Sequence, residues 1–431
     1  MCSIGDYLVV SLIVKGLVYC FFSFYLLFSV LAHHRSESFF GLLAVLGLFA
    51  FKDLGGKLKK DPLGYYERRL VWCFAAYSVI SLSVYLYWPF SGSSNLRVLD
   101  DLKFFVLIPF FLLLRGYTLN VRWFGVIFAV FAVLMGLISI GQYLNVELIT
   151  SFYPHSSRPS ADVNPMRYAV VALLMACFGI NYWLAFKSKS ILLKICLMTS
   201  ILFGLIACVL TQTRGVWLAI PLLSLVYCGY LFQLGSIKRL MIAMLAVFTL
   251  LCFSFQSVFV QNRLDHTVKN IERYQNGDKG SSLAVRLDMF KVSLLMVQEK
   301  PLLGHGLGVF KVKSKEIRES GRIGDGVHRQ VGIRKTPHNE FFQALVERGV
   351  VGLFVTFLLF LVPGIIFYRA LRQVSESTVF YGLSGMTLLL VFAVAGQTGT
   401  LFNHNLFTNF YIIMVLLFVS QIRRGSPRVL G

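Results

Sequence analysis

Charged residues are scarce in this chain, which sets it apart from soluble domains. Asp, Glu, Lys and Arg make up 14% of its 431 residues, whereas a soluble domain carries roughly 25%. Hydrophobic residues make up 57% of the chain. Because an open sheet cannot satisfy its backbone hydrogen bonds in lipid, this composition predicts an all-α, polytopic membrane protein.

Metal- and nucleotide-binding motifs are also missing. The sequence has no Asp-x-Asp pair, no P-loop and no Gly-x-Ser-x-Gly elbow. Its eight cysteines all lie in or beside apolar segments, so neither a disulfide framework nor a Cys/His metal site is indicated. We therefore expect no metal ion and no other cofactor. Any phosphate charge on a ligand would have to be met by arginine side chains.

Long apolar segments are what the chain has in abundance. A spanning helix needs about 20 mostly apolar residues, and we identify twelve such windows, of which the second and fourth are short enough to be tilted or broken. The first window lacks a small-residue cleavage site, so we expect it to stay as a helix rather than to be removed as a signal peptide. The windows are 16–32, 37–51, 69–88, 101–114, 122–144, 164–186, 190–211, 214–233, 238–259, 349–371, 378–398 and 403–422.

One long hydrophilic stretch, the lobe, separates the ninth window from the tenth. Residues 260–349 carry 16 Lys and Arg and 10 Asp and Glu. If the N-terminus is cytoplasmic, the short connecting segments carry 19 Lys and Arg inside and 6 outside. By the positive-inside rule this predicts two cytoplasmic termini and a lobe outside. The predicted organisation is therefore helices 1–9 in residues 1–259, a largely helical lobe in 260–348, and helices 10–12 with a basic cytoplasmic tail in 349–431.

The net charge of +21 bears on the partners of the protein. Cytoplasmic basic residues next to spanning helices bind anionic membrane lipid, and a basic lobe attracts an anionic ligand. Nucleic acid is not an expected partner, because the lobe faces away from the cytoplasm.

Two helices are predicted within the lobe. A longer one covers residues 283–300 and ends before a Gly-rich turn, and a short one lies near 309–319. The apolar face of the longer helix is predicted from side chains that recur at spacings of 4, 3, 4 and 3: Leu283, Leu287, Phe290, Leu294 and Val297.

His338 is the first candidate for chemistry. Thr336 is a good N-cap and Pro337 a good first helical residue, which would put His338 at the second position of a helix. The positive helix end and the nearby Arg334 and Lys335 should hold its pKa down. A neutral histidine can act as a general base. The alternative is a histidine that only caps or packs.

Two arginines are the next candidates. Arg214 lies at a helix start on the outer side, and Arg286 lies in the first turn of the lobe helix. A cation at a helix N-terminus is unfavourable unless something compensates, and a phosphate would do so because arginine binds it bidentately. The alternatives are an Arg214 that extends to lipid headgroups and an Arg286 that forms a salt bridge to Asp288 or to another acidic residue of the lobe.

Other polar residues are weaker candidates. Arg334 and Lys335 belong to a basic surface, most of which is expected to be solvated, as are His305 and His328. His404, in an outer turn, could face the same cavity as His338. Possible substrate contacts are therefore Arg334, Lys335, His404 and Asn339, which follows His338 directly.

Three motifs together resemble the O-antigen ligase and O-antigen polymerase superfamily. They are residues 211–217 (TQTRGVW), Arg286 with residues 301–306 (PLLGHG), and residues 338–340 (HNE) with 347–352 (ERGVVG). The helix number, the topology and the late lobe also match. Within the superfamily, the position of the lobe and its His-Asn-Glu helix are most similar to the lipopolysaccharide O-antigen ligases.

The resemblance implies a reaction and a place for it. In the ligases, a glycan moves from undecaprenyl diphosphate to a sugar of lipid A-core on the periplasmic side of the bacterial inner membrane. By that resemblance, His338 would deprotonate the acceptor hydroxyl. Arg214 and Arg286 would bind the diphosphate and stabilise it as the leaving group, in an inverting displacement that needs no metal.

Alternatives remain at this point. Within the superfamily, the chain could be an O-antigen polymerase or a protein O-oligosaccharyltransferase. From another class, it could be a transporter or flippase for an anionic lipid-linked glycan. No internal repeat, inverted pair of broken helices or relay of Asp, Glu and His across the spans is visible, which weakens the transporter hypothesis.

Overall fold

The computed structural model describes residues 61–88, 97–153, 158–161, 163–187, 190–235, 282–322 and 331–425, with a few single residues within 15–23, 238–241 and 265–276. Over these residues the chain is helical and contains no strand. The predicted spans 16–32, 37–51 and 238–259 lie outside the described residues.

Eight helices in the described part are long and apolar enough to cross a membrane. Each coincides with one predicted span, so eight of the predicted spans are confirmed as helices of sufficient length and apolarity, while the total of twelve stays a prediction. The eight are α4 (Tyr65–Tyr87), α7 (Val121–Tyr143), α9 (Pro165–Ala185), α10 (Ile191–Leu210), α11 (Arg214–Trp217) continued by α12 (Ala219–Gln233), α17 (Glu340–Ala370), α18 (Glu376–Gly396) and α19 (Asn405–Gly425).

The predicted span 101–114 is divided into two short helices, α5 (Arg97–Val106) and α6 (Ile108–Leu114). They meet at Leu107, two residues before Pro109. Proline has no backbone N–H and disturbs the preceding turn, which explains the break. Neither half is long enough to span a membrane alone.

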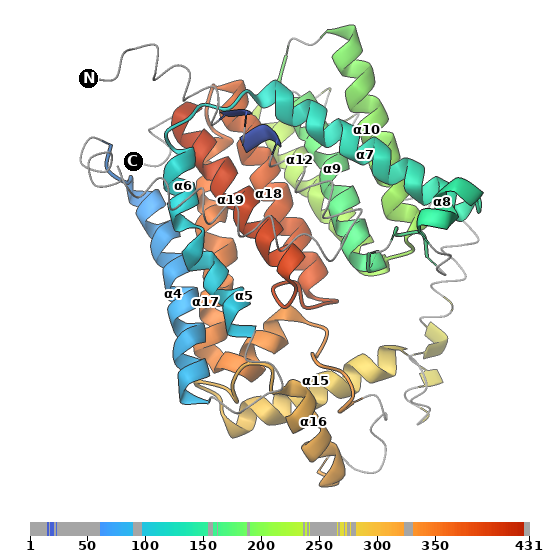
Figure 1. Cartoon of the computed structure of the whole chain (residues 1–431), viewed down its shortest axis with the longest axis vertical. Helices are drawn as coiled ribbons and strands as arrows, with labels where there is room; N and C mark the ends of the chain where they lie inside the picture. Colours follow the sequence, from blue (N-terminus) through green and yellow to red (C-terminus); the bar gives the residue numbers. More distant parts are fainter. Residues whose placement is uncertain are drawn as a thin grey trace.

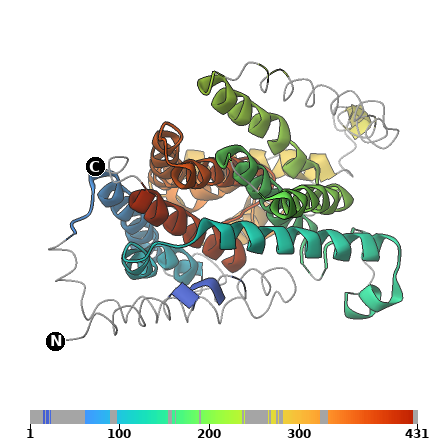
Figure 2. The ribbon, with the colours of Figure 1, turned by 90° about the horizontal axis from the view of Figure 1, so that it is seen from above.

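The last helix lies at the centre of the bundle. In α19, 94% of the apolar window is buried, against 28% in α10 and in α11–α12. Figure 1 shows α18 and α19 in the middle, with α4 and α17 on one side and α7, α9 and α10 on the other. Figure 2, turned by 90°, shows α7 running along one flank of the bundle. Helices α10 and α12 therefore present most of their apolar surface outward.

The lobe packs across one end of the bundle, which we call the lobe end. Its helices α15 (Ser282–Glu299) and α16 (Phe310–Glu319) lie beyond the start of α17 (Figure 1). Both predicted lobe helices are thereby confirmed. They share a small apolar core, separate from the core of the bundle, to which Val331 and Val346 also contribute.

The predicted apolar face of α15 is right only in part: Val297 packs against the lobe core and Phe290 stacks on Phe342 of α17. The side chains buried in the lobe core are Val285, Met289, Val292 and Met296, whereas Leu294 is 50% exposed. The predicted set and the buried set both repeat at helical spacing. Both are possible because α15 carries apolar residues on nearly all sides. Periodicity alone could not select between them, and packing against α16 and α17 does.

Helix α17 is broken at Gly349, where the lobe joins the bundle. Gly349 has φ 65° and ψ −159°, a combination that only glycine adopts readily. The break frees backbone groups that pair with residues 301–306: Val350 N–H donates to the Pro301 carbonyl at 2.8 Å, and His305 N–H donates to the Val346 carbonyl at 2.9 Å. A Cβ at Gly349 would overlap the Leu302 carbonyl. We call this contact the α17 joint.

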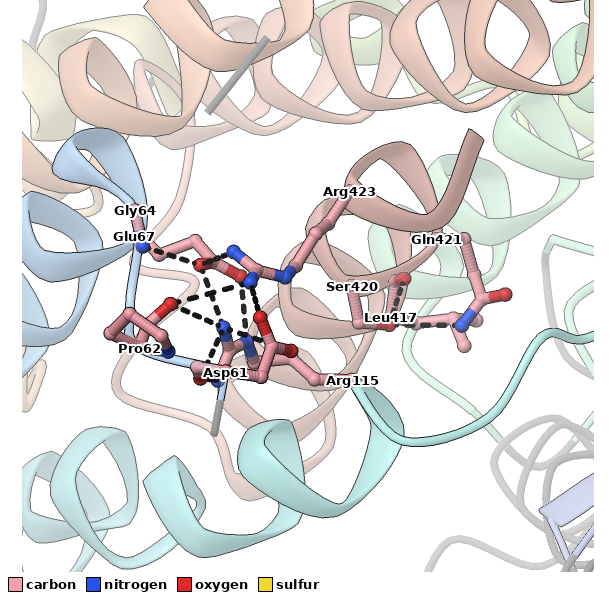
Figure 3. Close-up of polar contacts among 9 residues, drawn as sticks. All are labelled: Asp61, Pro62, Gly64, Glu67, Arg115, Leu417, Ser420, Gln421 and Arg423. Carbon is pink, nitrogen blue, oxygen red and sulfur yellow. Dashed lines mark hydrogen bonds and ion pairs between the residues drawn. The ribbon is translucent and has the colours of Figure 1, made fainter. Parts of the chain in front are cut away.

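The opposite end of the bundle is tied by a buried ionic cluster (Figure 3). Glu67, fully buried in the first turn of α4, accepts hydrogen bonds from Arg115 Nε at 2.8 Å and from Arg423. Arg423 also pairs with Asp61. Because Arg115 ends α6 and Arg423 lies in the last turns of α19, the cluster fixes three helix ends that are distant in sequence.

We predict that Gly349→Ala strongly destabilises the protein, while Gly364→Ala on the same helix does not. At Gly349 the backbone strain and the overlap with Leu302 should together cost about 3 kcal/mol or more. At Gly364 a Cβ meets only Leu389, at an ordinary 3.5 Å, and alanine favours the helix. Melting temperatures of the two purified variants in detergent provide the measurement, and equal melting temperatures would contradict the role of the joint.

Candidate active site

His338 lies just before α17, not inside it. The N-cap of α17 is Asn339, whose Oδ1 accepts the N–H groups of Phe341 and Phe342. The prediction of Thr336 as N-cap is therefore wrong. His338 itself has φ 55°, a left-handed conformation that costs a non-glycine residue about 1–2 kcal/mol.

The neighbours of His338 bind the α18–α19 linker, residues 397–404. Asn339 Nδ2 donates to the Gln397 side-chain oxygen at 3.1 Å. Glu340 is buried, and its Oε2 accepts the N–H groups of Leu401 at 2.6 Å and Phe402 at 3.1 Å. The segment that carries His338 is thereby fixed against the start of α19.

The surroundings of His338 favour its neutral form. The side chain is half-buried, and desolvation lowers its pKa from the ordinary value; the nearby positive charges of Arg286 and Arg334 lower the pKa further. The sequence predicted the effect of Arg334, but not burial as the main cause. A neutral imidazole can accept a proton.

Arg286 approaches His338 from the lobe. It lies on α15, which is held against α17 by stacked rings of Phe290 and Phe342, with centroids 4.8 Å apart. Phe290 follows Arg286 by one turn of α15, and Phe342 lies in the first turn of α17, which begins two residues after His338. Arg286 is half-buried, and burial lowers the pKa of its guanidinium, although not enough to neutralise an arginine.

Arg214 lies next to a residue that contacts the α18–α19 linker. It begins α11 and is exposed. A Cβ on the next residue, Gly215, would lie 2.9 Å from the Cβ of Thr398, so α11 is in close contact with the linker that Asn339 also contacts. The structure thus places Arg214, Arg286 and His338 around one end of the bundle.

The remaining predicted contacts fall at the same end, with different roles. Arg334 and Lys335 are exposed, just before His338. Asn339 is buried and serves as a cap. His404 is in the linker, where its Nδ1 lies 2.6 Å from Nη2 of Arg167, in the first turn of α9.

Several residues with defined roles in the structure had not been singled out in the sequence. Glu340 is one, and Arg167 is another. His305 was expected in solvent, yet it is buried and its Nε2 lies 2.7 Å from the Met296 carbonyl. Only the Gly-rich sequence around His305 could have indicated a tight packing position. Within the described residues, no group of three or more His, Cys, Asp or Glu side chains is placed to hold a metal ion.

Parts of the chain are similar in sequence to known proteins. Residues 199–357, which include Arg214, Arg286 and His338, match the family model described as O-antigen ligase. A Haemophilus influenzae protein described as "Uncharacterized protein" is 22% identical over 399 residues, covering 88% of this chain and 91% of that one. The ComP-specific O-oligosaccharyltransferase of Acinetobacter baylyi is 25% identical over 354 residues, covering 79% of this chain and 60% of that protein's length.

The fold indicates a multi-pass membrane protein, and these similarities indicate a chain that resembles glycosyltransferases of the O-antigen ligase kind. The resemblance to the O-antigen ligase and polymerase superfamily, predicted from three motifs, is confirmed by the family match over residues 199–357.

We predict that Arg334→Gln raises the pKa of His338. Removing a nearby positive charge makes protonation of the imidazole easier, so the neutral fraction should be lost at a higher pH than in the wild type. The rate of diethyl pyrocarbonate modification, followed at the His338 peptide by mass spectrometry across pH, measures this fraction. Lys315→Gln on α16 is the control and should leave the titration unchanged. A lower pKa of His338 in Arg334→Gln would contradict the conclusion that the positive charge of Arg334 lowers this pKa.

Proposed function

We propose that this protein is an O-antigen ligase. It would transfer a glycan from undecaprenyl diphosphate to lipid A-core on the periplasmic face of the bacterial inner membrane, with both of its termini in the cytoplasm. The observation that carries the proposal is the environment of His338: a half-buried histidine held neutral beside Arg286, with Arg214 next to a residue that contacts the linker, all within the segment that matches the ligase family.

In this mechanism His338 is the general base. Its neutral imidazole accepts the proton of the acceptor sugar hydroxyl, and the oxygen attacks the anomeric carbon of the donor. The glycosidic bond forms as the bond to the diphosphate breaks, on the opposite face of the sugar, which inverts the anomeric configuration. The pKa of His338 lies below its ordinary value, so the base is ready at neutral pH.

The two arginines would stabilise the leaving group. As the bond to the diphosphate breaks, negative charge accumulates on its oxygens, and guanidinium groups bind such oxygens in pairs. Arg286 is partly removed from water, which strengthens its attraction for an anion. Because the arginines carry this charge, the proposed reaction needs no metal ion.

A protein O-oligosaccharyltransferase is the second candidate, favoured by the similarity to the Acinetobacter baylyi enzyme of that name. It would use the same donor chemistry with a protein hydroxyl as acceptor. An O-antigen polymerase would use a second lipid-linked glycan, and a flippase would perform no transfer.

Deletion of the gene separates these candidates. For a ligase, lipopolysaccharide should lose all O-antigen while full-length polymer accumulates on the carrier lipid. Core with a single repeat would instead indicate a polymerase. Normal lipopolysaccharide with loss of a glycoprotein would indicate a protein transferase, and carrier-linked glycan trapped on the cytoplasmic side would indicate a flippase.

We expect His338→Ala to abolish transfer and leave the protein inserted and stable. General-base catalysis contributes roughly 10²–10⁴-fold, and a half-buried side chain before the helix contributes little packing. Turnover of purified variant on defined donor and acceptor measures the effect, with the melting temperature as the control for folding. Near-normal turnover would remove His338 from the mechanism.

Arg214→Lys and Arg286→Lys should both lose most activity. Lysine keeps the charge and loses the planar group that holds two phosphate oxygens, and stabilising groups of this kind contribute on the order of 3–4 kcal/mol each. The loss should appear in the single-turnover rate as well as in donor affinity. Arg318→Lys on α16 serves as a matched control. Wild-type rates in both lysine variants would show that neither arginine binds the leaving group.

A further inference from the structure

Glu340 is buried beside His338 and has no role in the mechanism above. Its side chain is 1% exposed. Oε2 accepts two backbone N–H groups of the α18–α19 linker, from Leu401 and Phe402, and Oε1 has no hydrogen-bond partner among the described residues. Without Glu340, two buried N–H donors would lose their partner, which costs about 1–3 kcal/mol for each unsatisfied group.

The linker that Glu340 binds reaches every other part of the candidate site on the bundle. Thr398 packs against Gly215, next to Arg214. His404 lies against Arg167, and Thr400 donates a hydrogen bond to Thr336 at 3.3 Å. The linker is therefore the structural connection between the segment of His338 and the helix of Arg214.

Residues on both sides of His338 bind the linker. Thr336, Asn339 and Glu340 all contact residues 397–402. His338 lies among them with its left-handed backbone. A strained residue persists only where its surroundings determine its conformation, and here three linker contacts do so. Of these, the Glu340 pair includes the shortest hydrogen bond and the most buried side chain.

We infer that Glu340 is a positioning residue for the proposed transfer reaction: through its two hydrogen bonds to Leu401 and Phe402 it sets the distance between the base His338 and the phosphate-binding Arg214. The inference rests on the proposed function. In this inference, what matters is the position of the acceptor oxygen Oε2 of Glu340 and not the negative charge of its carboxylate. The charged groups that lower the pKa of His338 are Arg286 and Arg334.

Position and charge are separable by two substitutions. Glu340→Gln keeps the length of the side chain and an acceptor oxygen but removes the charge. Glu340→Asp keeps the charge but withdraws the carboxylate by one methylene, out of reach of the linker. We expect Glu340→Gln to keep turnover within about fivefold of wild type, since a hydrogen bond to a neutral acceptor remains. Glu340→Asp should lose on the order of 100-fold, the effect of a displacement of about 1 Å.

A matched control exists at the other end of α18. Glu376 also accepts a backbone N–H through its Oε1, from Lys187 at 3.1 Å, but it lies a whole helix length away from the linker. Glu376→Gln and Glu376→Asp should both retain wild-type turnover. If Glu340→Gln is as inactive as Glu340→Asp, the charge matters and the positioning inference is wrong. It is equally wrong if Glu340→Asp turns over normally.

A double-mutant cycle supplies the readout that a general loss of stability would not change. If Glu340 places His338 relative to Arg214, then Arg214→Lys should cost much less in the Glu340→Asp background than in wild type. Independent, multiplicative losses in folded protein would overturn the inference. The proposed function itself would be wrong if the wild type showed no transfer or if His338→Ala were fully active. These two results come from the wild type and the His338 variant, not from the Glu340 variants.

Discussion

The structure depends on the α17 joint, where the helix that follows His338 breaks and the lobe is bound. Glu347 and Arg348 precede the break and are both fully buried. Glu347 accepts a hydrogen bond from Arg97 at 3.0 Å and another from the Gly308 N–H at 2.8 Å, so it joins α5 to the lobe. Arg348 donates to Asp101 at 2.7 Å and lies over the ring of Tyr77.

Such pairs define orientation more than they add stability. Desolvating two charges offsets most of their attraction, yet removing one partner leaves a buried charge that costs about 3–5 kcal/mol. A rotation of α17 would separate both pairs at once. The two ion pairs therefore fix the rotational orientation and the axial position of α17 relative to α4 and α5. They also fix the position of His338, which precedes the first turn of α17.

The motifs that carry the family resemblance divide between this joint and the site. Residues 301–306 and 347–352 form the joint, through backbone hydrogen bonds and glycines that no other residue could replace. Arg214, Arg286 and His338 supply the proposed chemistry.

The sequence predicted the spans well because hydropathy over about 20 residues is a strong signal. It failed where two choices were locally equivalent. Thr336 and Asn339 are both good N-caps, and contacts with Gln397 and Leu401, about 60 residues away, select the second. The two faces of α15 were equivalent in the same way. The role of Glu340 could not be found from local pattern, because a carboxylate in a first helical turn ordinarily indicates only a favourable charge.

The central position of α19 has a consequence for biosynthesis. A chain inserted into the membrane from its N-terminus makes this helix after all the other described spans, yet it is the most buried of them. The position of α19 between the earlier helices is consequently unfilled at first. Lipid or an insertion factor must cover their exposed faces until residues 405–425 are synthesised and inserted. The linker that binds Glu340 arrives with them. The nascent protein therefore contains Arg214, Arg286 and His338 before the linker that connects their helices is made, so the proposed site would be completed only with α19.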